Sequence, residues 1–258
     1  MINYLNQFKN NKKTAFIVGG AGFIGREITL ALLSSGAKVI VLDINKPKNI
    51  KKKNYFYYYF DCSNTQNLFK NYNKVVDKFG SPNIFINCSY PRTVDWPENS
   101  FKDISFPSYK KNLDIHLNSY AWLAKFAADS MVAKKKGGSI IQLSSTYGVV
   151  AQNMTIYKGT KMRDSMTYSI IKGGISNLSR QMASCYGEHN IRVNSICPGG
   201  VEAKSMHPKF VKNYRSLVPL KRLAKTSDVA SAALFLSSDA ASYITGTDFL
   251  VDGGWTCI

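Results

Sequence analysis

The most constraining feature of this chain is a regular alternation of short apolar or β-branched runs with segments of helical periodicity. We expect strands at Thr14–Gly19, Lys38–Asp43, Tyr55–Phe60, Asn83–Cys88, Ser139–Ser144, Ile191–Ile196 and Phe249–Val251. Helices are expected at about Phe23–Ser35, Ser63–Phe79, Tyr109–Lys135, Ser165–Tyr186 and Thr226–Leu236. Strands that alternate with helices in this way form parallel sheets with helices on both faces. The sequence therefore predicts an α/β fold with a doubly wound parallel sheet of about seven strands.

We expect the whole chain, residues 1–258, to form a single domain, because no internal repeat or low-complexity linker divides it. With 45% hydrophobic residues it can bury a sizeable core, which excludes a mainly disordered protein. No run of 18 apolar residues occurs, so no transmembrane helix is expected, and the first residues lack the apolar run of a signal peptide. The five cysteines are scattered without CxxC spacing, which favours free thiols and a cytoplasmic location.

The chain is strongly basic, with 34 Lys and Arg against 16 Asp and Glu and a formal charge of +18. Such a charge occurs in proteins that bind nucleic acid or anionic surfaces. It also arises when lysines accompany many asparagines, tyrosines and isoleucines on a solvated surface, as the composition of an AT-rich genome produces. The basic and aromatic stretch 51–60 is better explained as a loop and a strand. We therefore expect no nucleic-acid partner and no membrane partner; a nucleic-acid binder would lose affinity steeply with salt.

A glycine-rich turn follows the first expected strand. Gly19, Gly22 and Gly25 have the spacing GxxGxxG, and Phe23 and Ile24 open the next helix. Glycines here let a pyrophosphate approach backbone N–H groups at the positive end of a helix. The motif alone also fits an ordinary strand-to-helix turn, but its place between a strand and a helix favours a Rossmann-type dinucleotide site.

Asp43 ends the second expected strand, 18 residues beyond Gly25. A carboxylate at this place can accept hydrogen bonds from a ribose diol and would repel a 2′-phosphate, which favours NAD over NADP. Lys46 and Lys48 lie just downstream and could accommodate the phosphate, so NADP is not excluded. In the alternative interpretation Asp43 only begins a turn.

Tyr168 and Lys172 stand four residues apart, which places both side chains on one face of a helix. A tyrosine with a pKa near 10 is a poor base at neutral pH. A positive charge about 4 Å away, in a medium of effective dielectric ~20, is worth on the order of 4 kcal/mol. That interaction would bring the phenol pKa near neutrality, although a surface Tyr–Lys pair has the same spacing.

Three further motifs accompany this pair: Ser144-Ser145 at a strand end, Pro198-Gly199-Gly200, and the closing Val251-Asp252-Gly253-Gly254. Their order resembles that of the short-chain dehydrogenase/reductase family, from about Thr14 to Trp255. The resemblance implies that Tyr168 exchanges a proton with the substrate oxygen, Lys172 lowers the tyrosine pKa and Ser145 hydrogen-bonds the reacting oxygen, with Ser144 as its structural companion. It also implies a wall of Ile196, Pro198 and Val201 beside the nicotinamide. The cofactor contacts expected on this basis are Gly19, Gly22, Phe23, Ile24, Gly25, Asp43, Asp61, Cys62, Asn87, Ser89, Tyr168, Lys172, Pro198, Gly199 and Val201.

The sequence departs from that family's pattern at four places. The Asn usually found on the long helix is replaced by His116, with Asn118 nearby but out of register. His116 could hold the water of a proton relay and would add a titration near pH 6.5, or it is simply structural. The usual NNAG after the fourth strand reads Asn87-Cys88-Ser89-Tyr90, and Ala203 stands where a Thr is usual. Finally, Ser145 and Tyr168 are 23 residues apart, a longer separation than the family usually shows.

The longer separation reflects an insertion at about 149–166, which we expect to pass over the substrate mouth. With Tyr90 and Arg92, its Tyr157 and Arg163 are the expected substrate contacts, a polar, cationic rim suited to a hydroxylated substrate that carries carboxylate or phosphate. The segment about 201–220 is expected to bind substrate too. The alternative is a solvated loop whose charges reflect composition. The insertion, with SYPR and IHLNSY, resembles a subgroup tied to bacterial sugar modification, often called flagellin-modification proteins, of nonulosonic or amino-sugar pathways.

The sequence therefore predicts an NAD(P)-dependent oxidoreductase that interconverts an alcohol and a carbonyl on a polar, sugar-derived small molecule, with no metal. The family resemblance implies a homotetramer or homodimer. Two alternatives remain: a dinucleotide-binding module without catalysis, given His116 and Ala203, and a sugar-nucleotide epimerase or dehydratase that retains NAD, as the GxxGxxG spacing suggests.

Overall fold

Seven strands form one parallel sheet. The computed structural model of the chain describes residues 3–258. The strands are β1 (Thr14–Val18), β2 (Lys38–Asp43), β3 (Tyr55–Tyr59), β4 (Ile84–Asn87), β5 (Gly138–Leu143), β6 (Ile191–Pro198) and β7 (Asp248–Val251). Their order across the sheet is β3-β2-β1-β4-β5-β6-β7, and every neighbouring pair is parallel. This confirms the predicted Rossmann-type doubly wound sheet.

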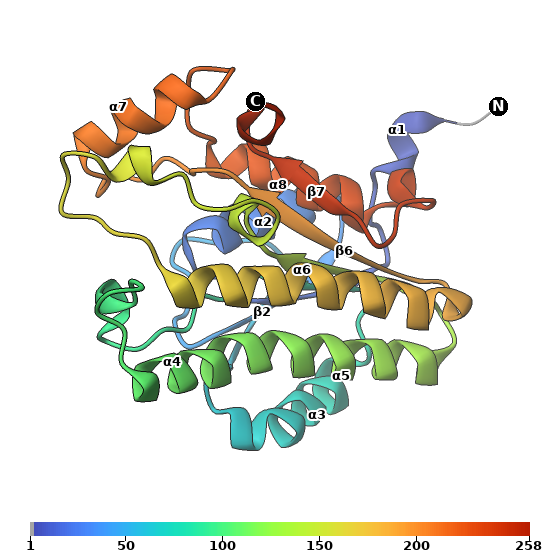
Figure 1. Cartoon of the computed structure of the whole chain (residues 1–258). Helices are drawn as coiled ribbons and strands as arrows, with labels where there is room; N and C mark the ends of the chain where they lie inside the picture. Colours follow the sequence, from blue (N-terminus) through green and yellow to red (C-terminus); the bar gives the residue numbers. More distant parts are fainter. Residues whose placement is uncertain (1–2) are drawn as a thin grey trace.

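Helices cover both faces of this sheet (Figure 1). They are α1 (Tyr4–Gln7), α2 (Phe23–Ser34), α3 (Leu68–Phe79), α4 (Phe106–Asn112), α5 (Ser119–Lys134), α6 (Met166–Tyr186), α7 (Pro208–Leu217) and α8 (Thr226–Ser237). Residues of α3, α5 and α6 pack with one face of the strands, and residues of α2 and α8 pack with the other. Each face therefore has its own apolar core.

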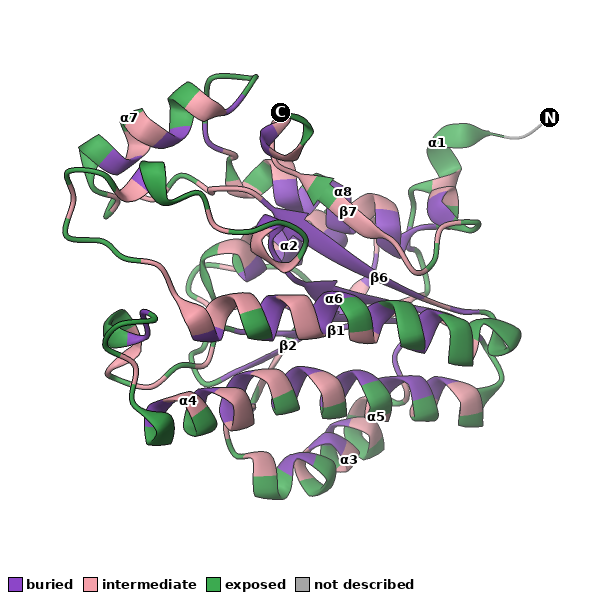
Figure 2. Cartoon of the chain, viewed as in Figure 1, coloured by how far each residue is buried: buried purple, intermediate pink, exposed green. Residues whose placement is uncertain are grey.

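The central strands are buried on both sides, as strands between two helical layers must be. In β1 the side chains alternate, with Phe16 in the core beneath α3 and α5 and Ile17 in the core beneath α2 and α8. Neither side chain has measurable exposure. Figure 2 shows the same division, with the strands buried and the outer faces of the helices exposed. Burial on both faces explains why these runs are continuously apolar in the sequence.

The long helix expected at Tyr109–Lys135 is interrupted by a π-helical segment, Leu113–Asn118, which joins α4 to α5. A π-helical turn inserts an extra residue and rotates the side chains that follow it. Sequence periodicity alone gives no sign of this interruption, although the segment contains His116.

The structure adds three local features that the sequence analysis did not specify. The stretch 198–220, for which no helix was predicted, contains α7, whose first residue is Pro208 and whose N-cap His207 accepts a hydrogen bond from the Lys209 N–H. The cap of α8 is Lys225, whose backbone N–H donates to the Asp228 carboxylate over 2.7 Å. The helix expected from about Ser63 begins later, after a short helical turn at Thr65–Asn67, and the Ser63 N–H donates to the Asp61 carboxylate instead. Proline favours the first helical turn as well as loops, which made the 198–220 segment ambiguous in the sequence.

The topology places one crevice at the carboxyl ends of the strands. β1 pairs with β2 on one side and with β4 on the other. The chain therefore leaves β1 and β4 in opposite directions around the sheet, which is the switch point where open α/β sheets bind ligands.

Candidate active site

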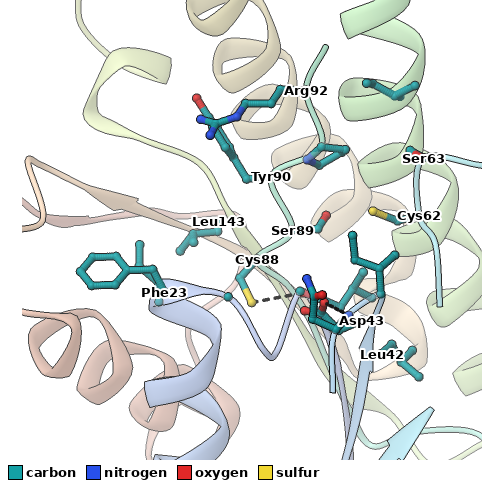
Figure 3. A pocket seen from close by; sticks show the side chains of 18 of the residues that line it. Phe23, Leu42, Asp43, Cys62, Ser63, Cys88, Ser89, Tyr90, Arg92 and Leu143 are labelled. Atoms are coloured by element: carbon teal, nitrogen blue, oxygen red, sulfur yellow. Dashed lines mark hydrogen bonds between the residues drawn. The ribbon is translucent and has the colours of Figure 1, made fainter. Parts of the chain in front are cut away.

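A cleft of about 730 Å³ opens at this switch point. Its walls come from the ends of β1, β2, β4, β5 and β6 and from the start of α6. In Figure 3, Asp43 and Leu42 lie toward one end of the cleft, and Tyr90 and Arg92 toward the other. The cleft is therefore long enough to separate two chemically different ends.

The glycine loop forms one wall because larger residues do not fit there. Gly19 has a φ of +76°, and a Cβ on it would lie 2.6 Å from the backbone N of Ser89. A Cβ on Gly25 would collide with the carbonyl oxygen of Gly19. Gly19, Gly22, Phe23 and Ile24 line the cleft, and α2 begins at Phe23 with its N-terminus at the cleft wall. This is the cradle that a pyrophosphate requires.

Asp43 holds the glycine loop against the end of β2. One carboxylate oxygen accepts a hydrogen bond from the Ala21 N–H over 2.9 Å, and the other accepts one from the Asn45 N–H over 2.9 Å. Each oxygen keeps a further lone pair, and the residue lines the cleft. Asp43 therefore both begins a turn and presents an acceptor to the cleft, so the two interpretations of this residue are compatible.

The same end of the cleft contains Asp61 and Cys62, both among its lining residues. The Asp61 carboxylate accepts hydrogen bonds from the Ser63 N–H over 2.9 Å and the Ser63 hydroxyl over 2.6 Å. Burial raises the pKa of the Cys62 thiol to about 11, so it stays protonated at neutral pH. Both residues stand where the sequence placed them.

Asn87 lies behind the cleft wall instead of in it. Its side chain is fully buried, and its oxygen accepts hydrogen bonds from the N–H and hydroxyl of Ser89. Ser89 lines the cleft, and its carbonyl accepts a hydrogen bond from the Tyr120 hydroxyl over 2.9 Å. Asn87 therefore does not line the cleft itself and instead orients Ser89, which does.

Tyr168 and Lys172 face the cleft from the first turns of α6. The Lys172 ammonium is buried and donates to the Leu143 carbonyl over 2.7 Å. It lies 5.6 Å from the centroid of the Tyr168 ring. Ser144 secures this helix to β5, because its hydroxyl donates to the Lys172 carbonyl over 2.9 Å. The structure therefore brings the predicted pair together.

The pKa of Tyr168 does not shift in the expected direction. Burial raises it above 10, and a hydrogen bond with Ser145 lowers it only in part. Burial also lowers the pKa of Lys172 to about 7, so at neutral pH the lysine carries only part of a positive charge. The prediction of a phenol pKa near neutrality is therefore wrong for this state of the protein, because desolvation outweighs the hydrogen bond with Ser145.

His116, and not Asn118, packs against the aromatic rings near Tyr168. The His116 ring is fully buried, 5.2 Å from the Tyr90 ring and 5.4 Å from the Tyr120 ring between centroids. Asn118 is exposed, and its amide donates to the Asp114 carboxylate over 3.4 Å. Burial, with a smaller effect of Lys172, lowers the pKa of His116 well below 6.5. A titration near pH 6.5 was therefore the wrong expectation for this residue.

Aromatic rings surround Tyr168. Tyr90, Trp96 and Tyr147 lie 6.2, 6.4 and 6.5 Å from it between ring centroids, each close to edge-on. The Arg92 guanidinium lies 5.4 Å from the Tyr90 ring centroid, and both residues line the cleft (Figure 3). Trp96 and Tyr147 were not predicted from the sequence, in which no spacing or motif relates them to Tyr168.

The far wall follows β6. Pro198, Gly199 and Val201 line the cleft as predicted. Ile196 does not: it is fully buried in the core beneath α8. In a parallel strand alternate side chains point to opposite faces, so only residues at and beyond the strand end reach the cleft.

The insertion at 149–166 does not line the cleft. Tyr157 packs on Phe210 of α7, with ring centroids 6.0 Å apart, and its hydroxyl donates to the Gln152 side chain over 3.4 Å. Arg163 forms an ion pair with Asp103. Neither side chain lines the cleft, so both substrate predictions are wrong in placement. The loop runs toward α7 (Figure 1).

Two further properties bear on the chemistry. Across residues 3–258, His, Cys, Asp and Glu side chains form no group of three that could hold a metal ion. Within the same residues, no helix combines the length and apolar character that crossing a membrane requires.

The fold and the cleft place this chain in the class of α/β oxidoreductases that bind a dinucleotide at the switch point of a parallel sheet. A family profile described as Enoyl-(Acyl carrier protein) reductase matches residues 19–256. The chain belongs to the short-chain dehydrogenase/reductase family.

Known proteins of this family resemble the chain over nearly its whole length. The Post-translational flagellin modification protein A of Campylobacter coli is 29% identical over 252 residues, covering 94% of this chain and 98% of that protein. The L-rhamnose-1-dehydrogenase of Scheffersomyces stipitis is 30% identical over 266 residues, covering 95% and 96%. A short-chain dehydrogenase from Leptospira borgpetersenii, solved with bound NAD⁺, matches with a TM-score of 0.87 at 29% identity, covering 99% of this chain and 96% of that one.

Proposed function

We propose that the protein interconverts a carbonyl and an alcohol on a polar, sugar-derived small molecule, using NAD(H) in preference to NADP(H). The observation that carries the proposal is that Tyr168 and Lys172 line the same cleft as the glycine loop, in which a side chain on Gly19 would collide with the backbone of Ser89. A bound nicotinamide cofactor supplies or takes up the hydride in this class of reaction.

The residues around the cleft fit such a cofactor. Gly19, Gly22 and the start of α2 would hold the pyrophosphate. Asp43 would accept hydrogen bonds from the adenosine ribose, which its free lone pairs permit. A negative carboxylate would repel a 2′-phosphate, and this favours NAD(H).

The proton step belongs to Tyr168. Because burial raises its pKa, the phenol holds its proton at neutral pH and can give it to an oxygen that gains negative charge. Ser145 lies beside Tyr168. Its hydroxyl is held there, because it accepts a hydrogen bond from the Tyr147 N–H over 3.1 Å. We propose that Ser145 orients the reacting oxygen, and that Lys172 favours the tyrosinate in the reverse direction when it is protonated.

The substrate end of the cleft supports a polar substrate. Arg92 is exposed there, and no carboxylate among the described residues pairs with it. Aromatic rings such as Tyr90 pack against the apolar faces of sugars, while Arg92 suits hydroxyl or anionic groups. The relatives named for flagellin modification and L-rhamnose oxidation support a sugar-derived substrate.

The test combines nucleotide binding with a single substitution. NAD⁺ or NADH at 100 times its dissociation constant should stabilise the protein by about 2.7 kcal/mol, and NADP(H) should do so less at equal concentration. Tyr168→Phe should keep this stabilisation and lose 10²-fold or more of the turnover found in a screen of L-rhamnose and other sugars and ketoses. Equal turnover in the wild type and Tyr168→Phe would refute the proposed acid–base role. Nucleotide binding with no turnover of any carbonyl or alcohol would favour a binding module.

A further inference from the structure

The insertion at 149–166 contacts the catalytic helix instead of the cleft. It runs from the short helical turn after Ser145 outward to α7 and back to the first residue of α6 (Figure 1). Its only side chain with several hydrogen bonds to α6 and its cap is that of Gln152, which is partly buried. This side chain therefore links the insertion to the element that carries Tyr168.

Gln152 bonds to both backbone polar groups of Ser165, the residue at the start of α6. Its Oε1 accepts from the Ser165 N–H over 3.2 Å, and its Nε2 donates to the Ser165 carbonyl over 3.1 Å. The same Nε2 lies 3.1 Å from the Ser169 hydroxyl. Ser165 is the N-cap of α6, and its hydroxyl accepts from the Tyr168 N–H over 3.2 Å. A continuous series of hydrogen bonds thus runs from Gln152 through Ser165 to the backbone of Tyr168.

A second amide holds the same turn from the other side. Asn99 is 1% exposed, its carbonyl accepts from the Met166 N–H over 3.0 Å, and its side-chain oxygen accepts from the Thr167 hydroxyl over 2.7 Å. Outside these contacts, the Phe101 N–H donates to the Asp164 carboxylate over 3.0 Å. The loops that precede α4 and α6 therefore brace each other across the start of the catalytic helix.

Such bracing matters because Tyr168 is the third residue of α6. The first N–H groups of a helix have no partner within the helix, so the first turn is the part most prone to fray. A reacting group displaced by about 1 Å can lose ~10²-fold in rate. A side chain that fixes this turn therefore fixes the position of the phenol relative to Ser145.

We propose that Gln152 is a positioning residue: the insertion uses its amide to hold the cap of α6, and thereby Tyr168, in the geometry for proton transfer. Asn99 supports the same turn from the opposite side. The proposal rests on the proposed function, because it assumes that Tyr168 exchanges the proton. It implies that the insertion affects kcat through the position of Tyr168 and does not contact the substrate.

The test compares Gln152→Met, which keeps the length of the side chain without hydrogen bonds, with Gln152→Glu, which keeps only the acceptor for the Ser165 N–H. The matched control is Asn153→Ala, because Asn153 is exposed and its side chain bonds only to Thr155. Turnover is measured as NADH-dependent reduction of 9,10-phenanthrenequinone. We expect Gln152→Met to lower kcat about 10-fold or more with the KM for NADH within twofold, Gln152→Glu to lie between, and Asn153→Ala to match the wild type.

A second measurement needs no substrate. In protein labelled with ¹³Cζ-tyrosine and saturated with NAD⁺, Tyr168→Phe identifies one of the 15 tyrosine resonances. We expect the titration midpoint of that resonance to move in Gln152→Met and to stay in Asn153→Ala. An unchanged midpoint together with an unchanged kcat overturns the positioning role, as does a rise in KM alone. If Tyr168→Phe turns over the quinone as fast as the wild type, the proposed acid–base function fails instead, and the resonance still decides whether Gln152 positions Tyr168.

Discussion

At the scale of single residues, burial determines the protonation states of Tyr168 and Lys172. The Lys172 ammonium lies 5.3, 5.6 and 5.9 Å from the ring centroids of Tyr120, Tyr168 and Tyr90. The π-faces of these rings attract a cation, but they do not replace its lost hydration, and burial lowers its pKa to about 7. At neutral pH the wall therefore carries only part of a positive charge, which suits the proposed role of the Tyr168 phenol as a proton donor.

The same reasoning predicts the state of His116. Neither ring nitrogen has a hydrogen-bond partner in the described structure, and burial holds its pKa well below 6.5. We expect its imidazole resonances to show no titration between pH 6 and 8 in an NMR experiment. His116→Asn identifies them, since the chain has three histidines. A midpoint near 6.5 for His116 would mean that the ring meets water or an acid that stabilises its charge.

At the scale of elements, the crossover from β1 to α2 leaves no room for a side chain at Gly25. A Cβ on Gly25 would collide with the Gly19 carbonyl oxygen, and it would lie 2.8 Å from the Cys88 sulfur. The backbone of α2 therefore approaches both β1 and the segment after β4. This close approach is what turns the N-terminus of α2 toward the cleft.

We predict that Gly25→Ala abolishes the stabilisation by NAD⁺. The added methyl group must push α2 away from the Gly19 carbonyl, so the N–H groups of the loop no longer converge on the pyrophosphate. The wild type should gain about 2.7 kcal/mol at 100 times the dissociation constant, and the variant should gain little at the same concentration. Thermal denaturation with and without NAD⁺ measures the difference.

The control for this variant is Gly187→Ala. A Cβ on Gly187 meets nothing within 4 Å, and its φ is −59°. We expect the NAD⁺-dependent stabilisation to be the same as in the wild type. Full stabilisation of Gly25→Ala by NAD⁺ would show that the nucleotide does not use this crossover.

Elements and motifs differed in how well the sequence predicted them. The strands and the Tyr168–Lys172 spacing could be predicted because burial on two faces and helical periodicity leave direct patterns in the sequence. The π-helical segment, α7 and the outward course of the insertion could not, because each depends on contacts between segments far apart in the chain. Arg163 shows this clearly: its cationic side chain suggested a substrate contact, yet it forms an ion pair with Asp103, 60 residues earlier.

At the scale of the whole molecule, the lysines that give the formal charge of +18 differ in what they contribute to the free energy of unfolding. Exposed lysines cost little because water solvates them, whereas a buried ammonium costs free energy that folding must supply. Lys172 is 3% exposed, and its hydrogen bond to the Leu143 carbonyl offsets only part of its desolvation. The charge state of Lys172 should therefore affect the free energy of unfolding of the entire protein.

We predict that the free energy of unfolding rises from pH 7 to 9.5 through Lys172. Its pKa is about 7 in the folded protein and about 10.4 in an unfolded chain, so in this range the unfolded state binds one more proton. Stability then increases with pH by up to about 1.4 kcal/mol per pH unit from this group. The raised pKa of the Cys62 thiol has the opposite effect above pH 8.5, but a comparison of variants cancels it.

Urea unfolding should give a curve for Lys172→Met that lacks this rise, while Lys70→Met, exposed on α3, keeps it. Parallel curves for the wild type and Lys172→Met would show that Lys172 stays protonated in the folded protein throughout this range, and that the phenol of Tyr168 faces a full positive charge.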